Sequence, residues 1–369
     1  MIKSVVILGN GCRYNPKLVE YLCSLGIPIL CSWMAMDLIP ENSPVFCGRP
    51  GIIGQRAANI IQQKSNVLYC FGARLDAGQI AYNYDNFAPS AKKIVYDVDR
   101  AELDKLPQTW EKHLVDLSKE MVYIDPEVDF DWLRWCRDLY NSFRGELDTI
   151  QTPKGFIDPY QFIDKLSNLC SGDDVLAPGS SGQTAEVFMQ TFKVKKGQRV
   201  TCVSTIGAMG ADIPMAIGAC LASGRKRTIC VTGDGGFMLN TQELEVVRRL
   251  NLPIKFFIFN NSGYGSVRVM QTGRFGNKVG CDKESGFTVP DLFNITDSFG
   301  INYMQVFDLN KSFFNFDTEY PMVYELRIDP EFRQFPKVLS PNLKIDPMEH
   351  MTPSLPEDEF DKIMRWGDG

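Results

Sequence analysis

The chain has 369 residues, a length that suits two domains of ordinary size. Its 39 basic and 45 acidic residues are interspersed, so the net charge of −6 argues against a surface that binds nucleic acid or an anionic membrane. Only two histidines, His113 and His350, are present, which leaves little scope for a histidine-built metal site or a Ser-His-Asp triad. Small molecules and other proteins are the expected partners.

The cysteines and the apolar runs indicate a cellular compartment. Eleven cysteines occur singly, often within apolar runs, with no CxxC pair and no secretory signal. This pattern is typical of buried thiols in a reducing environment, so we expect a cytoplasmic protein. No apolar run approaches the ~20 residues that a membrane-spanning helix needs, and we expect no membrane partner.

Residues 1–145 alternate short apolar runs with amphipathic helical patterns. Strands are predicted at 4–11, 27–32, 67–72 and 92–99, and helices at 16–26 and 54–66. Strands separated by helices favour a parallel sheet that is covered on both faces. The sequence therefore predicts a doubly wound α/β domain over 1–145.

A second alternating series follows a linker that we expect at 146–158, where turn-forming residues accumulate. Helices are predicted at 159–170, 183–192, 209–224 and 240–251, and strands at 174–179, 199–205, 228–233 and 254–260. The last of these helices is expected to begin at an Asn240 cap, with Glu243 three residues later. The series predicts a second doubly wound α/β domain over 159–330, again with a mainly parallel sheet. A C-terminal tail over 331–369 is expected to wrap the surface.

Two turns at the ends of predicted strands carry the chemistry. The strand at 228–233 runs into Gly-Asp-Gly-Gly, and the strand at 254–260 runs into Asn-Asn-Ser-Gly. About two dozen residues separate the turns, the scale of one βαβ crossover, so Asp234 and Asn261 are expected at the same edge of the sheet. A carboxylate, an amide oxygen and a backbone carbonyl at Gly263 would supply half of an octahedral shell for Mg²⁺. The alternative is two unrelated turns that merely end strands.

These motifs resemble the thiamine diphosphate (ThDP) and Mg²⁺ motif of the acetolactate synthase, pyruvate oxidase and benzoylformate decarboxylase superfamily. The resemblance extends to "IGAMGADIPMAIGA", "SSGQTAE" and "FAPSAKKIVYDVDRAEL" and covers nearly the whole chain. The segments "GCDKESGFTVPDL" and "GARLDAGQIAYN" are similar to acetolactate synthase-like enzymes found with bacterial surface-polysaccharide pathways. The family's fold implies a Rossmann-like middle domain followed by a domain that binds the ThDP diphosphate.

The resemblance implies roles for individual residues. The metal ligands would be Asp234, Asn261 and the carbonyl of Gly263. The cofactor-binding residues would be Gln183, Thr184, Gly235, Gly236, Asn261 and Tyr264. Thr184 departs from the histidine common in acetolactate synthases, which weakens that contact.

Two residues of "IGAMG" would act on the cofactor itself. The resemblance implies that the carbonyl of Gly207 holds the aminopyrimidine amino group and that Met209 is the apolar wedge that keeps ThDP bent. Plain core packing is the alternative for Met209, since methionine commonly fills gaps. The neighbouring motif favours the wedge.

The first domain has two interpretations. In acetolactate synthases a similar domain binds FAD, and Gly9, Arg74 and Asp97 fall where flavin contacts would lie. Many relatives keep this domain empty, so a spacer is the alternative. "LGNGCR" is not a GxGxxG fingerprint, and its glycines do not decide between the two.

Family members usually carry a third, N-terminal pyrimidine-binding domain, whose glutamate makes the aminopyrimidine basic. The chain opens on the first strand of the middle domain, and we expect a separate pyrimidine-binding subunit to supply that glutamate in an oligomer. The resemblance then implies a split enzyme that decarboxylates a 2-oxo acid and ligates the resulting enamine to a carbonyl acceptor. Aldehyde-releasing decarboxylases commonly use histidines, and none lies near a motif, which favours carboligation. The alternatives are a non-catalytic ThDP-binding or regulatory protein and a ThDP/flavin oxidoreductase.

Overall fold

The computed structural model describes residues 2–144, 152–179, 182–203, 207–309, 319–339 and 345–367. It divides into two compact units, which we call the first unit (Met1–Glu146 with Phe335–Gly369) and the second unit (Leu147–Gln334). The first half of the predicted linker, 146–151, lies outside the described residues. Residues of the predicted tail up to Gln334 belong to the second unit, and those from Phe335 onward belong to the first.

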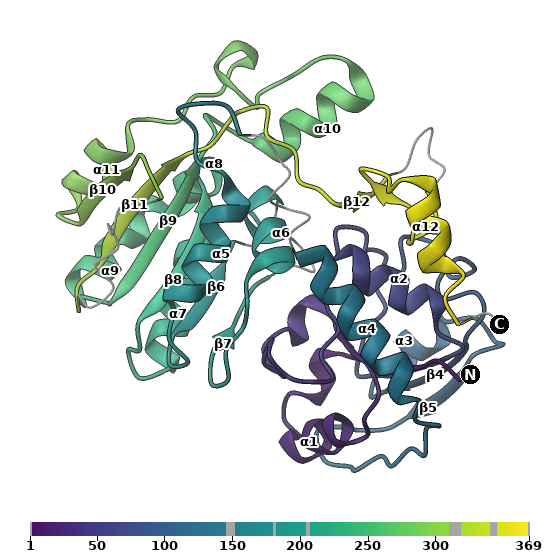
Figure 1. The fold of residues 1–369 in the computed structure, drawn as a ribbon. Helices are drawn as coiled ribbons and strands as arrows, with labels where there is room; N and C mark the ends of the chain where they lie inside the picture. Colours follow the sequence, from purple (N-terminus) through teal and green to yellow (C-terminus); the bar gives the residue numbers. More distant parts are fainter. Residues whose placement is uncertain are drawn as a thin grey trace. The chain divides into compact units, whose positions relative to one another are not determined.

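The first unit contains a five-stranded parallel sheet in the order β2-β1-β3-β4-β5, of which Figure 1 labels β4 and β5. Its strands are β1 (Ser4–Leu8), β2 (Ile29–Cys31), β3 (Val67–Phe71), β4 (Lys92–Asp97) and β5 (Glu111–Leu114). Its helices are α1 (Pro16–Ser24), α2 (Arg56–Lys64), α3 (Arg100–Asp104), α4 (Phe130–Ser142) and α12 (Glu357–Met364). Strands β1 and β2 are buried along their whole length, as expected of parallel strands covered on both faces.

The C-terminal segment completes the core of the first unit instead of wrapping its surface. Met348 is fully buried within that core. The buried guanidinium of Arg56, in α2, donates hydrogen bonds to the carbonyls of Met351 and Pro353. A short antiparallel pair, β12 (Lys337–Val338) and β13 (Met351–Thr352), precedes α12. The expectation of a surface tail is therefore wrong for these residues. The mostly polar composition of the segment does not reveal that Met348 is buried or that backbone carbonyls of the segment accept hydrogen bonds from Arg56.

The second unit contains a six-stranded parallel sheet in the order β10-β11-β9-β8-β6-β7. Its strands are β6 (Val175–Pro178), β7 (Arg199–Val200), β8 (Thr228–Gly233), β9 (Ile254–Asn260), β10 (Asn302–Val306) and β11 (Met322–Arg327). Its helices are α5 (Pro159–Leu169), α6 (Gly182–Thr191), α7 (Asp212–Ala222), α8 (Asp234–Phe237), α9 (Leu244–Arg249), α10 (Gly265–Phe275) and α11 (Leu292–Ser298). Both units are thus doubly wound α/β structures, and the predicted fold class is confirmed.

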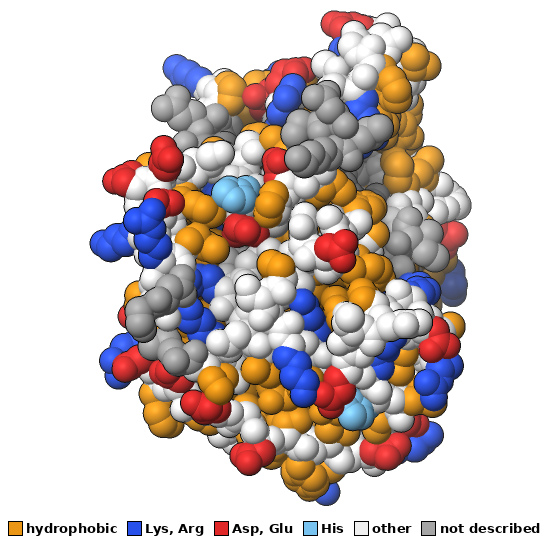
Figure 2. Space-filling view, turned by 90° about the vertical axis from the view of Figure 1, so that its right-hand side faces the viewer, with side chains coloured by type: hydrophobic (Ala, Val, Ile, Leu, Met, Phe, Trp, Pro, Cys, Tyr) orange, Lys and Arg blue, Asp and Glu red, His pale blue; other side chains and the backbone are white. Residues whose placement is uncertain are grey.

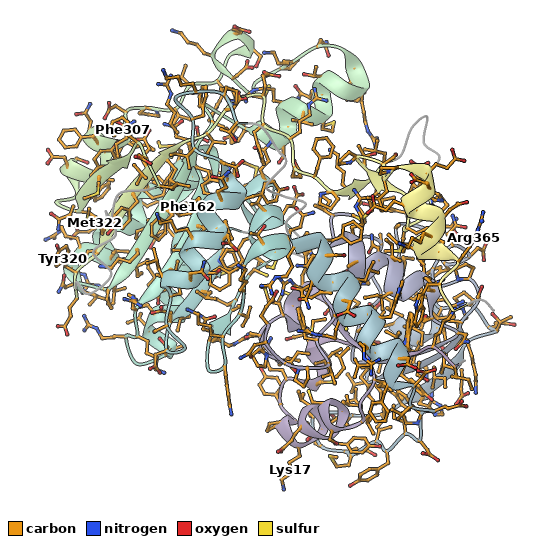
Figure 3. All side chains as sticks on the ribbon, viewed as in Figure 1. Lys17, Phe162, Phe307, Tyr320, Met322 and Arg365 are labelled. Atoms are coloured by element: carbon orange, nitrogen blue, oxygen red, sulfur yellow. The ribbon has the colours of Figure 1, made fainter. Side chains whose placement is uncertain are left out.

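Apolar side chains fill both sides of the second sheet. One core cluster joins α7, α9 and α11 to the sheet through residues such as Ile217, Val247 and Leu292. On the other side Phe162 of α5 packs against Phe257 of β9 with ring centroids 5.2 Å apart. Figure 3 shows Phe162 within the unit, whereas Phe307 lies near the outer edge of the sheet, beyond β10. The central strands β8 and β9, on which the functional turns follow, are therefore held rigidly.

The start of one predicted helix differs from the expectation. The helix predicted from Asn240 begins at Leu244, and a 3₁₀ segment (Met238–Glu243) precedes it. Asn240 has φ −140° and ψ 38°, and its side-chain amide donates to the carbonyl of Gly210 at 2.7 Å. The predicted cap is wrong because Asn240 uses its side chain to hold the segment that precedes α7, a contact with no local signature.

Charges of both signs intermingle on the surface. On the face in Figure 2, Lys and Arg side chains alternate with Asp and Glu, and no broad area carries a single sign. Within the described ranges, no helix combines the length and apolar composition needed to cross a membrane.

Candidate functional site

The two motif turns meet at the carboxyl edge of the second sheet. Strands β8 and β9 are hydrogen-bonded neighbours, with Gly233 in register with Phe259. Asp234 follows β8 as the first residue of α8, and Asn261 follows the end of β9. Their side chains are brought together because parallel neighbouring strands end at the same edge, the place where open α/β sheets bind ligands. Both predicted positions therefore lie beside each other.

Asp234 ties the two turns together. Its side chain is almost wholly buried, with 1 % of the residue exposed. One carboxylate oxygen accepts the backbone N–H of Gly235 at 2.9 Å, and the other accepts the N–H of Gly263 at 2.9 Å. Burial raises the pKa of Asp234 to about 7, although these N–H groups and the charge of Arg268 act in the opposite direction. A cation bound against this carboxylate would hold it in its ionised form.

The amide of Asn261 is oriented by Gln183. The Asn261 Nδ2 donates to the Oε1 of Gln183 at 2.9 Å, and the Gln183 Nε2 donates to the carbonyl of Phe332 at 2.7 Å. This chain of bonds assigns which end of each amide is oxygen. The Oδ1 of Asn261 is consequently the free end, and it is buried with no hydrogen-bond partner among the described residues. Gln183 thus uses its side chain on Asn261, whereas the resemblance implied that it lies along the diphosphate.

Gly263 is required by the shape of the Asn261–Gly263 turn. Ser262 has φ 61° and Gly263 has φ 142°, two backbone conformations that side-chain-bearing residues rarely adopt. A Cβ on Gly263 would lie 2.2 Å from the carbonyl oxygen of Cys281. Only glycine therefore permits the turn to lie between Asp234 and the segment that contains Cys281.

A pocket at this edge collects most of the predicted residues. Those that line it are Gln183, Thr184, Met209, Asp234, Gly235, Gly236, Asn261, Gly263 and Tyr264. Tyr264 stacks on Phe287 with centroids 4.2 Å apart, and a Cβ on Gly235 would lie 2.5 Å from the Tyr264 ring. Gly235 therefore makes room for the tyrosine. Met209 lines the pocket and is 43 % exposed, so it is not a core residue.

One predicted residue, Gly207, does not line the pocket, and parts of two motifs are not described by the structure. Gly207 has φ 62°, and it is not among the described residues that line the pocket. Parts of two motifs lie outside the described residues, namely 180–181 of "SSGQTAE" and 204–206 near "IGAMG". The role expected of the Gly207 carbonyl stays a prediction.

Two charged residues at this site were not among those predicted from the sequence. Asp212, the first residue of α7, is buried and lines the pocket, and its carboxylate accepts the hydroxyl of Thr232 at 2.6 Å. Arg268 of α10 is buried, and its guanidinium lies behind Gly263. The sequence does carry a signal for both, because each is a charged residue within a stretch of small or apolar residues. Asp212 lies in "MGADIPMAIGA" and Arg268 in "GSVRVM".

The donor set fits a hard divalent cation. Asp234 offers a carboxylate, and Asn261 offers a buried amide oxygen that lacks a partner. A buried acceptor without a donor is costly, so such an atom commonly serves a ligand. Among the described residues, no group of three or more His, Cys, Asp or Glu side chains could hold a metal. A cation here would depend on the mixed set of carboxylate, amide and backbone oxygens, which suits Mg²⁺.

The first unit places its three predicted flavin contacts at one edge. Gly9 follows β1, Arg74 follows β3 and Asp97 ends β4, and these strands are successive neighbours in the sheet. A Cβ on Gly9 would lie 2.0 Å from the carbonyl oxygen of Gly72, so the loops after β1 and β3 touch through their backbones. In the same "GARLDAGQIAYN" segment, the Nε2 of Gln79 is buried with no partner among the described residues. That donor is compatible with a polar ligand at this edge.

Fold and site together define a doubly wound α/β protein with an oxygen-lined pocket at the carboxyl edge of its second sheet. The family model described as "Thiamine pyrophosphate enzyme, central domain" matches residues 2–119. The model described as "Thiamine pyrophosphate enzyme, C-terminal TPP binding domain" matches residues 180–313, which include the predicted site residues from Gln183 to Tyr264. The chain belongs to the thiamine pyrophosphate enzymes, thiamine pyrophosphate being another name for ThDP.

The chain is also a distant homologue of acetolactate synthase large subunits. It is 29 % identical over 305 residues to the acetolactate synthase isozyme 2 large subunit of Escherichia coli (strain K12), covering 81 % of this chain and 54 % of that protein. It is 28 % identical over 357 residues to a probable acetolactate synthase large subunit of Methanococcus aeolicus, covering 89 % and 58 %. The Escherichia coli isozyme 1 large subunit is 27 % identical over 356 residues, covering 91 % and 60 %. The chain therefore spans little more than half the length of these curated relatives.

Proposed function

We propose that the chain is the ThDP-binding part of an acetolactate synthase-like enzyme that decarboxylates a 2-oxo acid and joins the remaining fragment to a carbonyl acceptor. The observation that carries the proposal is the partnerless Oδ1 of Asn261 beside the buried carboxylate of Asp234. An oxygen pair of this kind, at the end of neighbouring parallel strands, suits a cation that bridges protein and diphosphate.

In this proposal each pocket residue has a defined task. Asp234, Asn261 and the carbonyl of Gly263 bind Mg²⁺. When bound, ThDP would supply the nucleophilic carbon and the electron sink that decarboxylation of a 2-oxo acid requires. The chain's own residues bind and orient the cofactor and exclude water. Met209 contributes the apolar surface that supports its bent conformation.

The remaining contacts follow from where the side chains lie. Gly235 and Gly236, at the start of α8, line the pocket, and their backbone would lie along the diphosphate in this proposal. Thr184 and Tyr264 line the pocket and contact the cofactor in this proposal. Gln183 acts through Asn261, because its side chain is committed to that amide and to a backbone carbonyl.

We further propose that a separate pyrimidine-binding subunit covers the open side of this pocket in an oligomer. Met209 supports this, because it lines the pocket and is 43 % exposed, so this wall is accessible to a covering polypeptide. The covering subunit would supply the glutamate that activates the aminopyrimidine. Purified chain with ThDP and Mg²⁺ is expected to be inactive on pyruvate until that polypeptide is added. Robust pyruvate consumption by the chain alone would contradict the proposal.

The metal site is tested by calorimetric titration of ThDP in the presence of Mg²⁺. Asp234→Ala is expected to abolish saturable binding, because the metal loses its charged protein ligand while the diphosphate charge remains. Asp234→Asn preserves the side-chain shape and is expected to weaken binding strongly. Asp297→Ala, an exposed position in α11, is the control and is expected to bind like wild type. Equal ThDP affinity in Asp234→Ala, Asp297→Ala and wild type would exclude the assigned site.

The first unit is proposed either to bind FAD or to act as a spacer. The partnerless Nε2 of Gln79, in the segment after β3, favours a bound polar ligand. The absorbance spectrum of the purified protein distinguishes the two. A flavin spectrum supports the FAD site and keeps a ThDP/flavin oxidoreductase in consideration, whereas a colourless protein that takes up no added FAD supports the spacer.

A further inference from the structure

The Asn261–Gly263 turn, which carries the proposed metal ligands, is held in place by a buried arginine side chain. Arg268 lies on α10, and only 4 % of it is exposed. One terminal nitrogen of its guanidinium donates to the backbone carbonyls of Asn261 at 3.2 Å and Ser262 at 3.4 Å. The other terminal nitrogen donates to the carbonyl of Pro330 at 2.6 Å. A single side chain thus joins the turn to the segment that follows β11.

The guanidinium is itself oriented by the loop around Asp282. Arg268 Nε donates to the Asp282 carboxylate at 3.3 Å, and Lys278 donates to the same oxygen at 2.6 Å. The other carboxylate oxygen accepts the backbone N–H of Ser285 at 3.0 Å. The carbonyl of Cys281, one residue before, accepts the N–H of Tyr264 at 2.9 Å. The motif "GCDKESG" therefore forms a platform beneath the turn.

The turn needs such a support because its own backbone is unfavourable. Ser262 and Gly263 both have positive φ angles, and the carbonyls of Asn261 and Ser262 accept hydrogen bonds from the Arg268 guanidinium. Backbone strain of this kind persists only where the surroundings over-determine it. Arginine suits the task because its planar fork offers five donors and stays charged, whereas lysine would reach the same carbonyls from one point.

We propose that Arg268 is a positioning residue of the cofactor site, which holds the Asn261–Gly263 turn in the conformation that directs oxygen ligands to the metal. Asp282 orients Arg268 in turn. The inference rests on the proposed function, since it gives the turn a metal to bind. Arg268 does not line the pocket, and its effect on the metal passes through Asn261 and Gly263.

The test is a titration of Mn²⁺ with ThDP, followed by the electron paramagnetic resonance signal of free Mn²⁺. Mn²⁺ replaces Mg²⁺ as a spectroscopic probe. Arg268→Gln is expected to weaken Mn²⁺ binding about 10–100-fold, the usual cost of removing a group that supports a metal ligand. Arg268→Lys is expected to recover part of the loss. Arg274→Gln, an exposed position on the same helix, is the matched control and is expected to bind like wild type.

A second measurement distinguishes a positioning role of Arg268 from a general effect on the stability of the fold. The melting temperature is measured with and without Mn²⁺ and ThDP, because ligand binding raises it by an amount that grows with the logarithm of the ligand concentration divided by Kd. A positioning role predicts that Arg268→Gln loses most of the cofactor-induced rise, whereas a purely structural role lowers both values equally and would overturn the proposal. If Arg268→Gln does not fold, Asp282→Asn decides instead. Unchanged Mn²⁺ affinity in folded Asp282→Asn overturns the proposal, and weakened affinity supports it. Failure of wild type to bind Mn²⁺ with ThDP would refute the proposed function itself.

Discussion

Replacing Gly263 by alanine tests the turn that holds the proposed metal ligands. The backbone of Gly263 has φ 142°, and a Cβ built there lies 2.2 Å from the carbonyl oxygen of Cys281. That oxygen accepts the N–H of Tyr264 at 2.9 Å, so it cannot retreat without losing the bond. The new methyl group must therefore distort either the turn or the platform below it.

The expected loss of stability has two parts, the backbone strain of a non-glycine residue and the loss of a hydrogen bond. A non-glycine residue forced into this region of φ and ψ costs about 1–3 kcal/mol. Loss of the Tyr264 hydrogen bond adds about 0.5–1.5 kcal/mol. We expect Gly263→Ala to lower the free energy of unfolding by about 2–4 kcal/mol. Gly273 in α10 is the matched control, because a Cβ added there would have nothing within 4 Å of it, and Gly273→Ala is expected to stabilise by about 0.5–1 kcal/mol.

Urea unfolding followed by circular dichroism measures the difference. All 5 tryptophans lie in the first unit, so their fluorescence serves as an internal control that should not change. Calorimetry with Mg²⁺ and ThDP should show weakened binding in Gly263→Ala and unchanged binding in Gly273→Ala. A Gly263→Ala protein with the wild-type unfolding curve and the wild-type affinity would refute the geometry on which the site rests.

Three further outcomes are expected. Lys255 of β9 is completely buried, and burial lowers its pKa to about 8 from 10.5. Below pH 8 Lys255 is protonated in both the folded and the unfolded chain, so the folded state bears the whole cost of burying the charge. That cost falls as the pH rises toward 10.5. Denaturant unfolding at pH 7 and pH 10 should therefore show wild type gaining stability with pH relative to Lys255→Met, and a difference that does not change with pH would contradict the lowered pKa of Lys255. Chelation of divalent cations should abolish the rise in melting temperature that ThDP causes, and a rise that survives chelation would contradict metal-dependent binding. The reconstituted enzyme should convert pyruvate mainly to a carboligation product, because neither His113 nor His350 lines the pocket, and free acetaldehyde as the main product would count against this.

Sequence periodicity determined the fold class and the position of the two motif turns. Apolar runs of strand length separated by helical patterns predict a parallel sheet, because only strands buried on both faces carry such runs. The spacing between Asp234 and Asn261 fits one crossover, and a crossover places both at one edge of the sheet. These are consequences of local backbone geometry and chain connectivity, which the amino-acid order states directly.

Tertiary structure alone decided which side chains support the turn. Gln183 meets Asn261 across 78 residues, and Arg268 meets the carbonyl of Pro330 across 62. The buried Met348 completes a core whose first strand begins at Ser4. Such contacts depend on how loops close and where side chains of separate elements converge, and no periodicity records that. A lone arginine after a glycine-rich turn has the same local pattern whether it lies on the surface or, like Arg268, is buried beneath the proposed metal site.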